Sequence, residues 1–307
     1  NNGNLQTSLP YRNLGLSGRF TYALDSKYFG EFNFGFNGSE RFAKSERFGF
    51  FPSFGFGWYA SNEDFLKPYE DIVTKLKFKG TYGLVGNDQI GSSADRFFYI
   101  SQVNLNDGPM GSMFGQEFSN WINGVSIDRY ANDQITWEKA TMMNLGVELG
   151  LFGKVDFQAD YFTEYRSNIL MDRAQIPATM GLQAPIRANV GEASSKGFEF
   201  TIDYKDDLSS DLFVSARANF SYATSKYEVY EELDYVTAGL PWRSRIGLNL
   251  SQPWGYIAER LFIDDADIAN SPVQTFGDYM PGDIKYKDIN NDGIIDINDE
   301  VPIGYPT

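Results

Sequence analysis

One acidic segment, residues 288–300, carries the side chains of this chain that are best suited to bind a metal ion. Oxygen-bearing side chains stand at its first, third, fifth, ninth and twelfth positions, and a glycine stands at the sixth, where the chain must turn sharply. This spacing is typical of a calcium loop, in which a hard cation collects about six to eight oxygens. The predicted Ca²⁺ ligands are Asp288, Asn290, Asp292, Asp296 and Asp299, the backbone carbonyl of Ile294, and Glu300 as a substitute for Asp299.

The flanks of this segment predict β structure instead of the two helices of a helical calcium hand. Residues 282–287 alternate like a strand, and residues 301–306 contain two prolines, which prevent a helix. We therefore expect residues 281–305 to form a calcium-type loop that stiffens a surface of the protein. The alternative is a turn without metal, because Asp, Asn and Gly favour turns in any case.

The composition excludes several classes of function. The chain of 307 residues has no Cys and no His, so it lacks thiolate chemistry, the commonest zinc ligand and the usual general base. Its net charge of −15 argues against nucleic acid as a partner, because phosphate binding needs clustered Lys and Arg. Without a His partner for its Ser and Asp residues, the chain is not expected to be an enzyme.

Long alternating runs of apolar and polar residues recur along the chain and predict antiparallel strands. They cover residues 14–24, 28–37, 48–58, 75–84, 142–149, 155–161, 198–205 and 212–222. These runs approach or exceed the ~9–11 residues with which a tilted strand crosses a bilayer, whereas strands of soluble proteins usually have about five or six. No apolar run is long enough for a membrane-spanning helix.

The connections between the runs are unequal in length. Some are short turns, at residues 25–27, 152–154 and 206–210, and others are long, at residues 86–133, 167–195 and 228–305. Short turns at one end and long loops at the other are typical of outer-membrane barrels. In such a barrel the apolar face contacts lipid and the polar face lines the lumen, whereas in a soluble sandwich the apolar face lies inward.

Side chains near the strand ends allow two interpretations. Aromatic residues there, which are Tyr22, Tyr28, Trp58, Trp137, Tyr161 and Tyr222, suit a girdle at the membrane interface, but core aromatics would explain each of them. The polar faces carry Lys75, Lys77, Lys79, Asp156, Asp160, Glu199, Asp203 and Arg217. These charges suit either the docking of a plug or the passage of a substrate, or they simply line a wet interior.

Several segments, in order along the chain, resemble those of the SusC/RagA-type TonB-dependent transporters. They are residues 51–58, 76–87 and 189–199, and the acidic loop at 281–293 followed by Ile303-Gly304. The resemblance implies an all-β fold, an antiparallel transmembrane β-barrel segment that is part of a large barrel of about 22 strands with long extracellular loops. On this interpretation residues 1–307 belong to the barrel domain, and the plug domain and the last strands are absent from this chain.

The resemblance also implies a function, a location and partners. It implies TonB-energised import of oligosaccharides or peptides across the outer membrane of a Gram-negative bacterium. A SusD-like lipoprotein would close the barrel mouth as a lid, and TonB would act through the plug. Alternatives are a secreted calcium-stabilised β-sandwich that binds glycans or acts as an adhesin, and a passive porin.

The long connection at residues 86–133 is the candidate for contact with a ligand or a partner. It shows no strong periodicity, and a loop of that length is usually functional. Its aromatic residues are Phe97, Phe98, Tyr99, Phe114, Phe118 and Trp121. They would stack on sugars and pack against a lid protein, or they would fold the loop upon itself.

Overall fold

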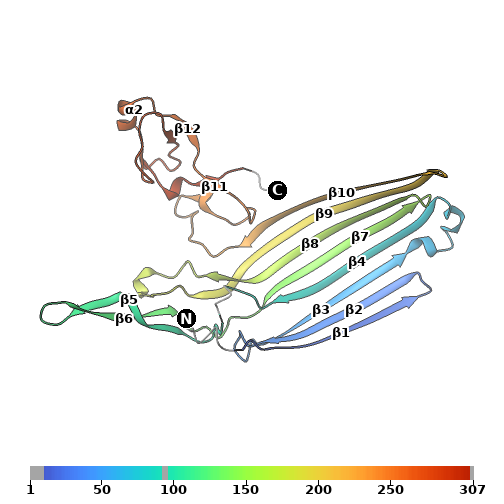
Figure 1. The fold of residues 1–307 in the computed structure, drawn as a ribbon, viewed down its shortest axis with the longest axis horizontal. Coiled ribbons are helices and arrows are strands. Elements are labelled where there is room, and N and C mark those ends of the chain that lie inside the picture. Colours follow the sequence, from blue (N-terminus) through green and yellow to red (C-terminus); the bar gives the residue numbers. More distant parts are fainter. Residues whose placement is uncertain (1–9, 92–95, 305–307) are drawn as a thin grey trace. The chain divides into compact units, whose positions relative to one another are not determined.

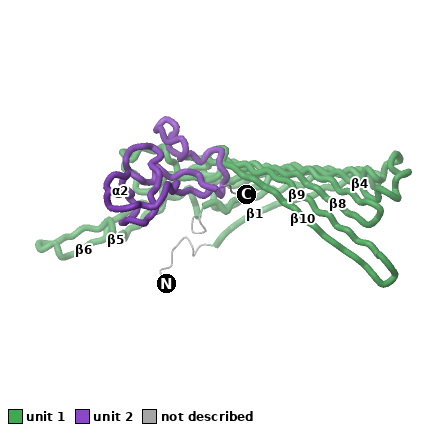
Figure 2. Tube along the Cα trace, turned by 90° about the horizontal axis from the view of Figure 1, so that it is seen from above, with its two compact units in different colours: residues 1–231 green, residues 232–307 purple. Residues whose placement is uncertain are grey.

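The computed structural model describes residues 10–91 and 96–304, and the chain forms two compact units. Residues 1–231 make up the first unit and residues 232–307 the second (Figure 2). The described residues include no helix that is both long enough and apolar enough to cross a membrane.

The first unit is built on an eight-stranded sheet in which every neighbouring pair of strands is antiparallel (Figure 1). The strands follow one another in sequence order as β1 (Asn13–Leu24), β2 (Tyr28–Ser39), β3 (Phe48–Tyr59), β4 (Val73–Asn87), β7 (Glu138–Leu151), β8 (Val155–Asp172), β9 (Arg187–Ser209) and β10 (Leu212–Val229). Their lengths run from 12 residues in β1 to 23 in β9, well above the usual length of about five or six. The eight strands predicted from alternation are therefore confirmed.

Three tight turns join strands at one end of the sheet, which we call the turn end, and the two longest connections, β4 to β7 and β8 to β9, lie at the other, the loop end (Figure 1). The turns after β1 and β7 use left-handed backbone at Asp25 and Ser26, and at Phe152 and Gly153. Such positive φ angles match the twist of a tight hairpin. The connection of β3 to β4 at the turn end contains two 3₁₀ turns, η1 (Ala60–Asn62) and η2 (Lys67–Tyr69).

Glu63 fastens this connection to the sheet. Its carboxylate accepts hydrogen bonds from the Tyr28 hydroxyl at 2.6 Å, the Lys27 ammonium at 2.9 Å and the Trp58 indole N–H at 3.3 Å. The hydrogen bonds from Tyr28 and Lys27, which favour the ionised form, lower the pKa of Glu63 to about 2. The connection is therefore held to the first two hairpins of the sheet.

Register places most of the apolar residues of the alternating runs on one face of the sheet, the apolar face. Phe20, Phe32 and Phe54 are cross-strand partners there, and Trp58 pairs with Phe78. These rings are not covered by a second layer, since Phe20 is 65% and Phe54 56% exposed. A soluble sandwich, which would bury this face against another sheet, is therefore wrong for this chain.

The opposite face, the polar face, carries ion pairs across neighbouring strands. Arg19 lies 2.5 Å from Glu31, and Arg217 lies 2.6 Å from Asp203. The predicted separation of an apolar and an ionic face is thus present along the sheet.

Two predicted loops contain more β structure than the sequence indicated. Residues 86–133 include a hairpin, β5 (Gln102–Phe114) with β6 (Asn120–Arg129), which extends from the loop end in Figure 1. Its register shifts at several points, and these bulges remove the period of two that would have revealed it. The loop predicted at 167–195 is also shorter, because β8 and β9 pair as far as Asp172 and Arg187, leaving only residues 173–186 with a 3₁₀ turn, η3 (Ala178–Met180).

A small hydrophobic core, the mouth core, lies at the loop end. It consists of Phe42, Phe51, Ile90, Phe98, Ile135 and Trp137. Trp137 is only 6% exposed, and its ring centroid lies 5.4 Å from that of Phe42 and 5.3 Å from that of Phe51. The prediction that Trp137 lies in an aromatic girdle at the membrane interface is therefore wrong, and Trp137 is a core residue, which was the alternative.

The second unit consists of short elements. They are η4 (Pro241–Arg243), β11 (Trp254–Gly255), β12 (Ala258–Leu261), α2 (Asp265–Ala269), β13 (Val273–Gln274), β14 (Ile284–Tyr286), β15 (Ile294–Ile295), η5 (Ile297–Asp299) and β16 (Val301–Pro302). The pairs are β11 with β16, β12 with β14, and β13 with β15. The predicted strand before the acidic segment is present as β14, and no long helix follows the segment within the described residues.

Candidate functional sites

Both sides of the acidic segment 288–300 are tied to β13, which lies outside it. Strand β15, inside the segment, pairs in parallel with β13, and Ile295 is completely buried. On the other side, the buried Gln274 of β13 accepts a hydrogen bond from the Tyr286 N–H at 2.9 Å and donates one to the Ile284 carbonyl at 3.2 Å. One glutamine thus joins the strand before the segment to the strand within it.

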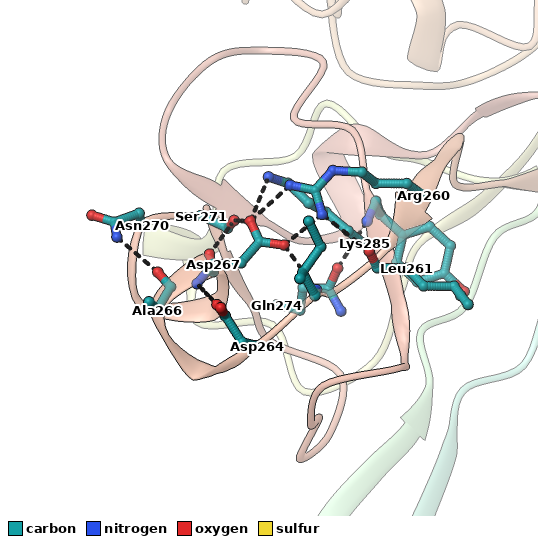
Figure 3. A network of polar contacts seen from close by, with 11 residues as sticks. Arg260, Leu261, Asp264, Ala266, Asp267, Asn270, Ser271, Gln274 and Lys285 are labelled. Carbon is teal, nitrogen blue, oxygen red and sulfur yellow. Dashed lines mark hydrogen bonds and ion pairs between the residues drawn. The ribbon is translucent and has the colours of Figure 1, made fainter.

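Asp267 of α2 organises the residues around β12 and β14 (Figure 3). Its carboxylate accepts hydrogen bonds from both terminal nitrogens of Arg260, from the Ile263 N–H at 3.1 Å and from the Ser271 hydroxyl. The Lys285 ammonium lies 3.8 Å from the same carboxylate. The hydrogen bonds from Arg260 hold the pKa of Asp267 well below its usual range. This network supports β14, which leads directly into the acidic segment.

The first half of the acidic segment folds into the sharp turn that the spacing predicts. Asn291 and Gly293 have positive φ angles of 61° and 84°. The Asp288 carboxylate accepts hydrogen bonds from the N–H groups of Asn291 at 2.7 Å and Gly293 at 2.8 Å. Asp292 accepts the N–H of Ile294 at 2.8 Å and the Asn290 side-chain amide at 2.8 Å.

The second half of the segment closes around a buried carboxylate. Asp299 is 0% exposed, and it accepts N–H groups of Ile289 at 2.8 Å and Asp296 at 2.9 Å. The bond from the Asp296 N–H completes a capping box at the start of η5. In this capping box the Asp296 side chain in return accepts hydrogen bonds from backbone N–H groups of η5. Asp299 therefore connects the beginning of the segment with its end.

The donor set suits a hard cation, and the charge of the segment is unbalanced. Asp288, Asp292, Asp296 and Asp299 form no ion pair with any described residue, whereas Glu300 lies 3.2 Å from the Arg243 guanidinium. Within residues 10–91 and 96–304, no three Asp or Glu side chains converge closely enough to hold a metal, and the carboxylates of Asp288 and Asp299 accept hydrogen bonds from backbone N–H groups. The predicted side-chain ligands are therefore close in sequence, but within the described residues they do not converge on one point. Tyr305, the end of the predicted loop, lies outside the described residues.

The aromatic residues of the candidate partner loop divide into three sets by their burial. Phe98 is 1% exposed and belongs to the mouth core, so it folds the loop upon itself. Phe97 and Tyr99 are half-buried and contact each other edge to face at 6.2 Å. Phe114, Phe118 and Trp121 belong to the β5–β6 hairpin or its tip and are exposed, with Phe118 at 70%. Of these six residues, only Phe114, Phe118 and Trp121 have exposed rings.

Buried arginines hold the mouth core together, and they were not identified from the sequence. Arg41 donates to the carbonyls of Asp88 at 3.0 Å and Ile90 at 3.2 Å. Arg129 donates to the Arg96 carbonyl at 2.9 Å, and its guanidinium lies 5.7 Å from the Phe98 ring centroid. Their heads bind backbone carbonyls, which carry no sequence signal, so the residue type alone did not distinguish them from surface arginines.

The polar face brings the predicted wall charges together. Lys75 lies 2.6 Å, and Lys77 and Lys79 each 3.7 Å, from the Glu148 carboxylate. Lys79 also lies 3.0 Å from Asp160, which is 5% exposed. Such ion pairs are compatible with a solvated interior, because each lysine keeps a partner as well as access to water.

Asp156 and Glu199 on the same face form no ion pair among the described residues. Asp156 is the cross-strand partner of Asp203, and Glu199 is that of Asp160. Two like-charged pairs therefore lie between β8 and β9. The face borders a hollow of about 1040 Å³ whose lining includes Lys79 and Glu199.

Comparisons with known proteins identify related chains over almost the whole sequence. Residues 2–298 match the family described as TonB dependent receptor-like, beta-barrel. TonB-dependent receptor P3 of Formosa agariphila is 27% identical over 300 residues, which cover 94% of this chain and 28% of that protein. TonB-dependent receptor SusC of Bacteroides thetaiotaomicron is 31% identical over 211 residues, covering 67% of this chain and 20% of SusC.

Solved structures share the fold. The RagAB peptide importer in its closed-closed state matches with a TM-score of 0.66 at 20% identity, covering 95% of this chain and 30% of that one. The RagAB peptide transporter matches with a TM-score of 0.67, also at 20% identity. This chain thus spans less than a third of the length of each of these relatives.

Proposed function

The chain belongs to the family of TonB-dependent receptor-like β-barrels, and we propose from this premise that it forms part of the wall of a TonB-energised nutrient importer. The family assignment confirms the expected resemblance to SusC/RagA-type proteins, the β-barrel fold and the location in the outer membrane of a Gram-negative bacterium. It also agrees with the expectation that the chain is not an enzyme.

The separation of the two faces supports this function. Rings such as Phe20 and Phe54 are exposed on a face that suits hydrocarbon, and ion pairs such as that of Lys79 with Asp160 line the other. A polar wall whose charged side chains mostly form ion pairs with one another suits an aqueous path for large polar cargo, because few unpaired charges remain to bind that cargo tightly. Peptides or oligosaccharides are the cargo we propose.

A SusD-like lipoprotein is the partner we propose at the loop end, with TonB acting through a plug. The exposed rings of Phe114, Phe118 and Trp121 support such a contact, because aromatic residues are enriched where proteins bind one another. The mouth core supports it as well, since it gives the β5–β6 hairpin a rigid base.

Uptake measurements in the source bacterium test the proposal. Deleting the full-length gene should abolish uptake of labelled oligosaccharides or peptides, and a protonophore should abolish it in wild-type cells. Replacing residues 103–127 by an Asn-Gly turn should leave a folded barrel in the membrane fraction but reduce co-purification of a surface lipoprotein. Uptake that persists with the protonophore would point to a passive porin and contradict the proposal.

We further propose that residues 288–299 bind a structural Ca²⁺ ion. Four carboxylates lie within twelve positions without an ion pair, and one of them, Asp299, is fully buried. A buried charge is costly unless a counter-charge balances it, and a divalent cation would supply that charge. Asp288, Asn290, Asp292, Asp296 and Asp299 would hold the ion with the Ile294 carbonyl, at an expected Kd of about 10⁻⁴–10⁻³ M.

Limited proteolysis of the full-length protein tests the calcium proposal. Trypsin should cleave after Lys287 faster in chelator than in millimolar Ca²⁺, because the metal would hold the segment closed. Asp299→Asn should lose this dependence on Ca²⁺, and Asp278→Asn, an exposed aspartate outside the segment, should keep it. Equal cleavage of the wild type in both conditions would leave the metal-free turn as the explanation.

A further inference from the structure

The register of β8, β9 and β10 shows where the apolar face ends. Successive rows across these strands are Val155–Tyr204–Ala216, Phe157–Ile202–Ala218, Ala159–Phe200–Phe220 and Tyr161–Phe198–Tyr222. All four rows consist of aromatic or aliphatic side chains. The last of them is composed entirely of aromatic rings, as expected at a membrane interface.

The next two rows on the same face are polar. They are Thr163–Lys196–Thr224 and Tyr165–Ser194–Lys226. They lie toward the loop end, which is the extracellular end of an outer-membrane barrel. Lys196 and Lys226 therefore stand at the level of the headgroups of the outer leaflet, directly beyond the aromatic row.

Lys196 is an exposed ammonium without an ion pair among the described residues. Its row neighbours, Thr163 and Thr224, add two hydroxyl groups. An unpaired cation beside hydrocarbon favours a negatively charged neighbour, because the low dielectric strengthens the attraction. We propose that Lys196, assisted by Lys226, binds the phosphate of a phosphorylated glycolipid in the outer leaflet.

The carboxylates on this side of the sheet do not neutralise Lys196. Glu228 accepts a hydrogen bond from the Ser194 hydroxyl at 2.6 Å and lies 3.0 Å from the Lys226 ammonium. Glu192 accepts a hydrogen bond from the Tyr165 hydroxyl. Glu228 stands one row beyond Lys226, and so farther from the apolar rows than Lys196. Toward the loop end, Lys196 is thus the charged residue nearest to the apolar rows on this face of β8, β9 and β10. Lys226 is a second cation, and it forms an ion pair with Glu228.

The inference depends on the outer-membrane location and not on the cargo. A basic residue at a lipid surface contributes about 1 kcal/mol toward an anionic headgroup, which corresponds to about fivefold in affinity for each lysine. The test uses the full-length protein in mild detergent, with native mass spectrometry to count bound lipid. The probes are monophosphorylated lipid A, its dephosphorylated form, and inorganic phosphate alone.

Wild-type protein should retain the phosphorylated lipid in preference to the dephosphorylated one. K196Q/K226Q should lose about 25-fold of that preference, and K196R/K226R should restore it because the charge remains. K44Q, which removes an exposed loop lysine, should behave like the wild type. The heat-modified gel mobility of each variant verifies that its barrel is folded.

Three results would overturn the proposal. They are equal retention of the two lipids by the wild type, a preference unchanged in K196Q/K226Q, and lysine-dependent binding of inorganic phosphate that equals the binding of the lipid. The last result would mean that the two lysines recognise the free ion instead of a membrane headgroup.

Discussion

Replacing Phe98 by alanine should loosen the loop end of the sheet without unfolding the barrel. Phe98 is 1% exposed and packs in the mouth core, beneath the Arg129 guanidinium. A Phe→Ala change at such a site costs about 3–5 kcal/mol. At the lower limit, the open population of these loops rises about 150-fold, since each 1.4 kcal/mol is about a factor of ten.

Hydrogen–deuterium exchange of the full-length protein measures this opening directly. The Phe98 N–H donates to the Arg41 carbonyl, and the Asn132 N–H donates to the Phe98 carbonyl, so both amides report on the core. Their exchange should accelerate about 150-fold in Phe98→Ala, whereas amides in the centre of β8 should stay unchanged. Phe118→Ala, which removes an exposed ring from the same connection, is the matched control. Equal protection of these amides in Phe98→Ala and wild type would refute the existence of a cooperative mouth core.

Two further predictions concern the turn end and the polar face. The pKa of Glu63 lies at about 2, below its ordinary value of 4.5, so its stabilisation of the connection 60–72 is complete above about pH 4.5 and is lost as the pH falls toward 2. Hydrogen exchange of that connection should show this dependence on pH, and Glu63→Gln should remove it. If the protection of the connection in the wild type did not change with pH, Glu63 would not be what holds it to the sheet. Lys79→Met should lower the free energy of unfolding in urea by about 3 kcal/mol, because it leaves the buried Asp160 without its nearest cation. The double variant Lys79→Met/Asp160→Leu should recover most of that loss, and an unchanged urea midpoint in the single variant would show that the pair is not coupled.

The strands of the wall could be predicted from the sequence because both of their faces have a uniform environment. Phe198, Phe200 and Ile202 alternate with Glu199 and Thr201, and one side of the strand meets an apolar medium while the other meets water. A period of two follows directly from this arrangement. Tight turns such as the one at Phe152 and Gly153 were found for the same reason, as short breaks between two periodic runs.

The loop end could not be predicted in this way. Phe51 lies on the polar face yet is buried, because the loops fold over it and supply Phe42 and Trp137 as neighbours. That burial depends on contacts between residues far apart in the sequence, such as the hydrogen bond from the Trp137 indole to the Arg47 carbonyl. Alternation within a single strand carries no information about such contacts.

The acidic segment was an intermediate case. Its sharp turn follows from the spacing, and Gly293 adopts the positive φ angle expected at the sixth position. The support from Asp267 and Arg260 could not be foreseen, because these residues come from elements that precede the segment by about two dozen positions. The calcium ion itself stays a prediction.

The connection of β4 to β7 has a consequence for how proteins of this type diversify. The intervening residues form their own hairpin and contribute their own buried side chains, while Gly86 and Asn87 still pair with Lys139 and Glu138 as if the interruption were absent. The β5–β6 hairpin can therefore be exchanged for one with a different outer surface, while the mouth core and the sheet on either side keep their alignment. A new outer surface can arise by grafting this hairpin, without redesign of the wall that carries it.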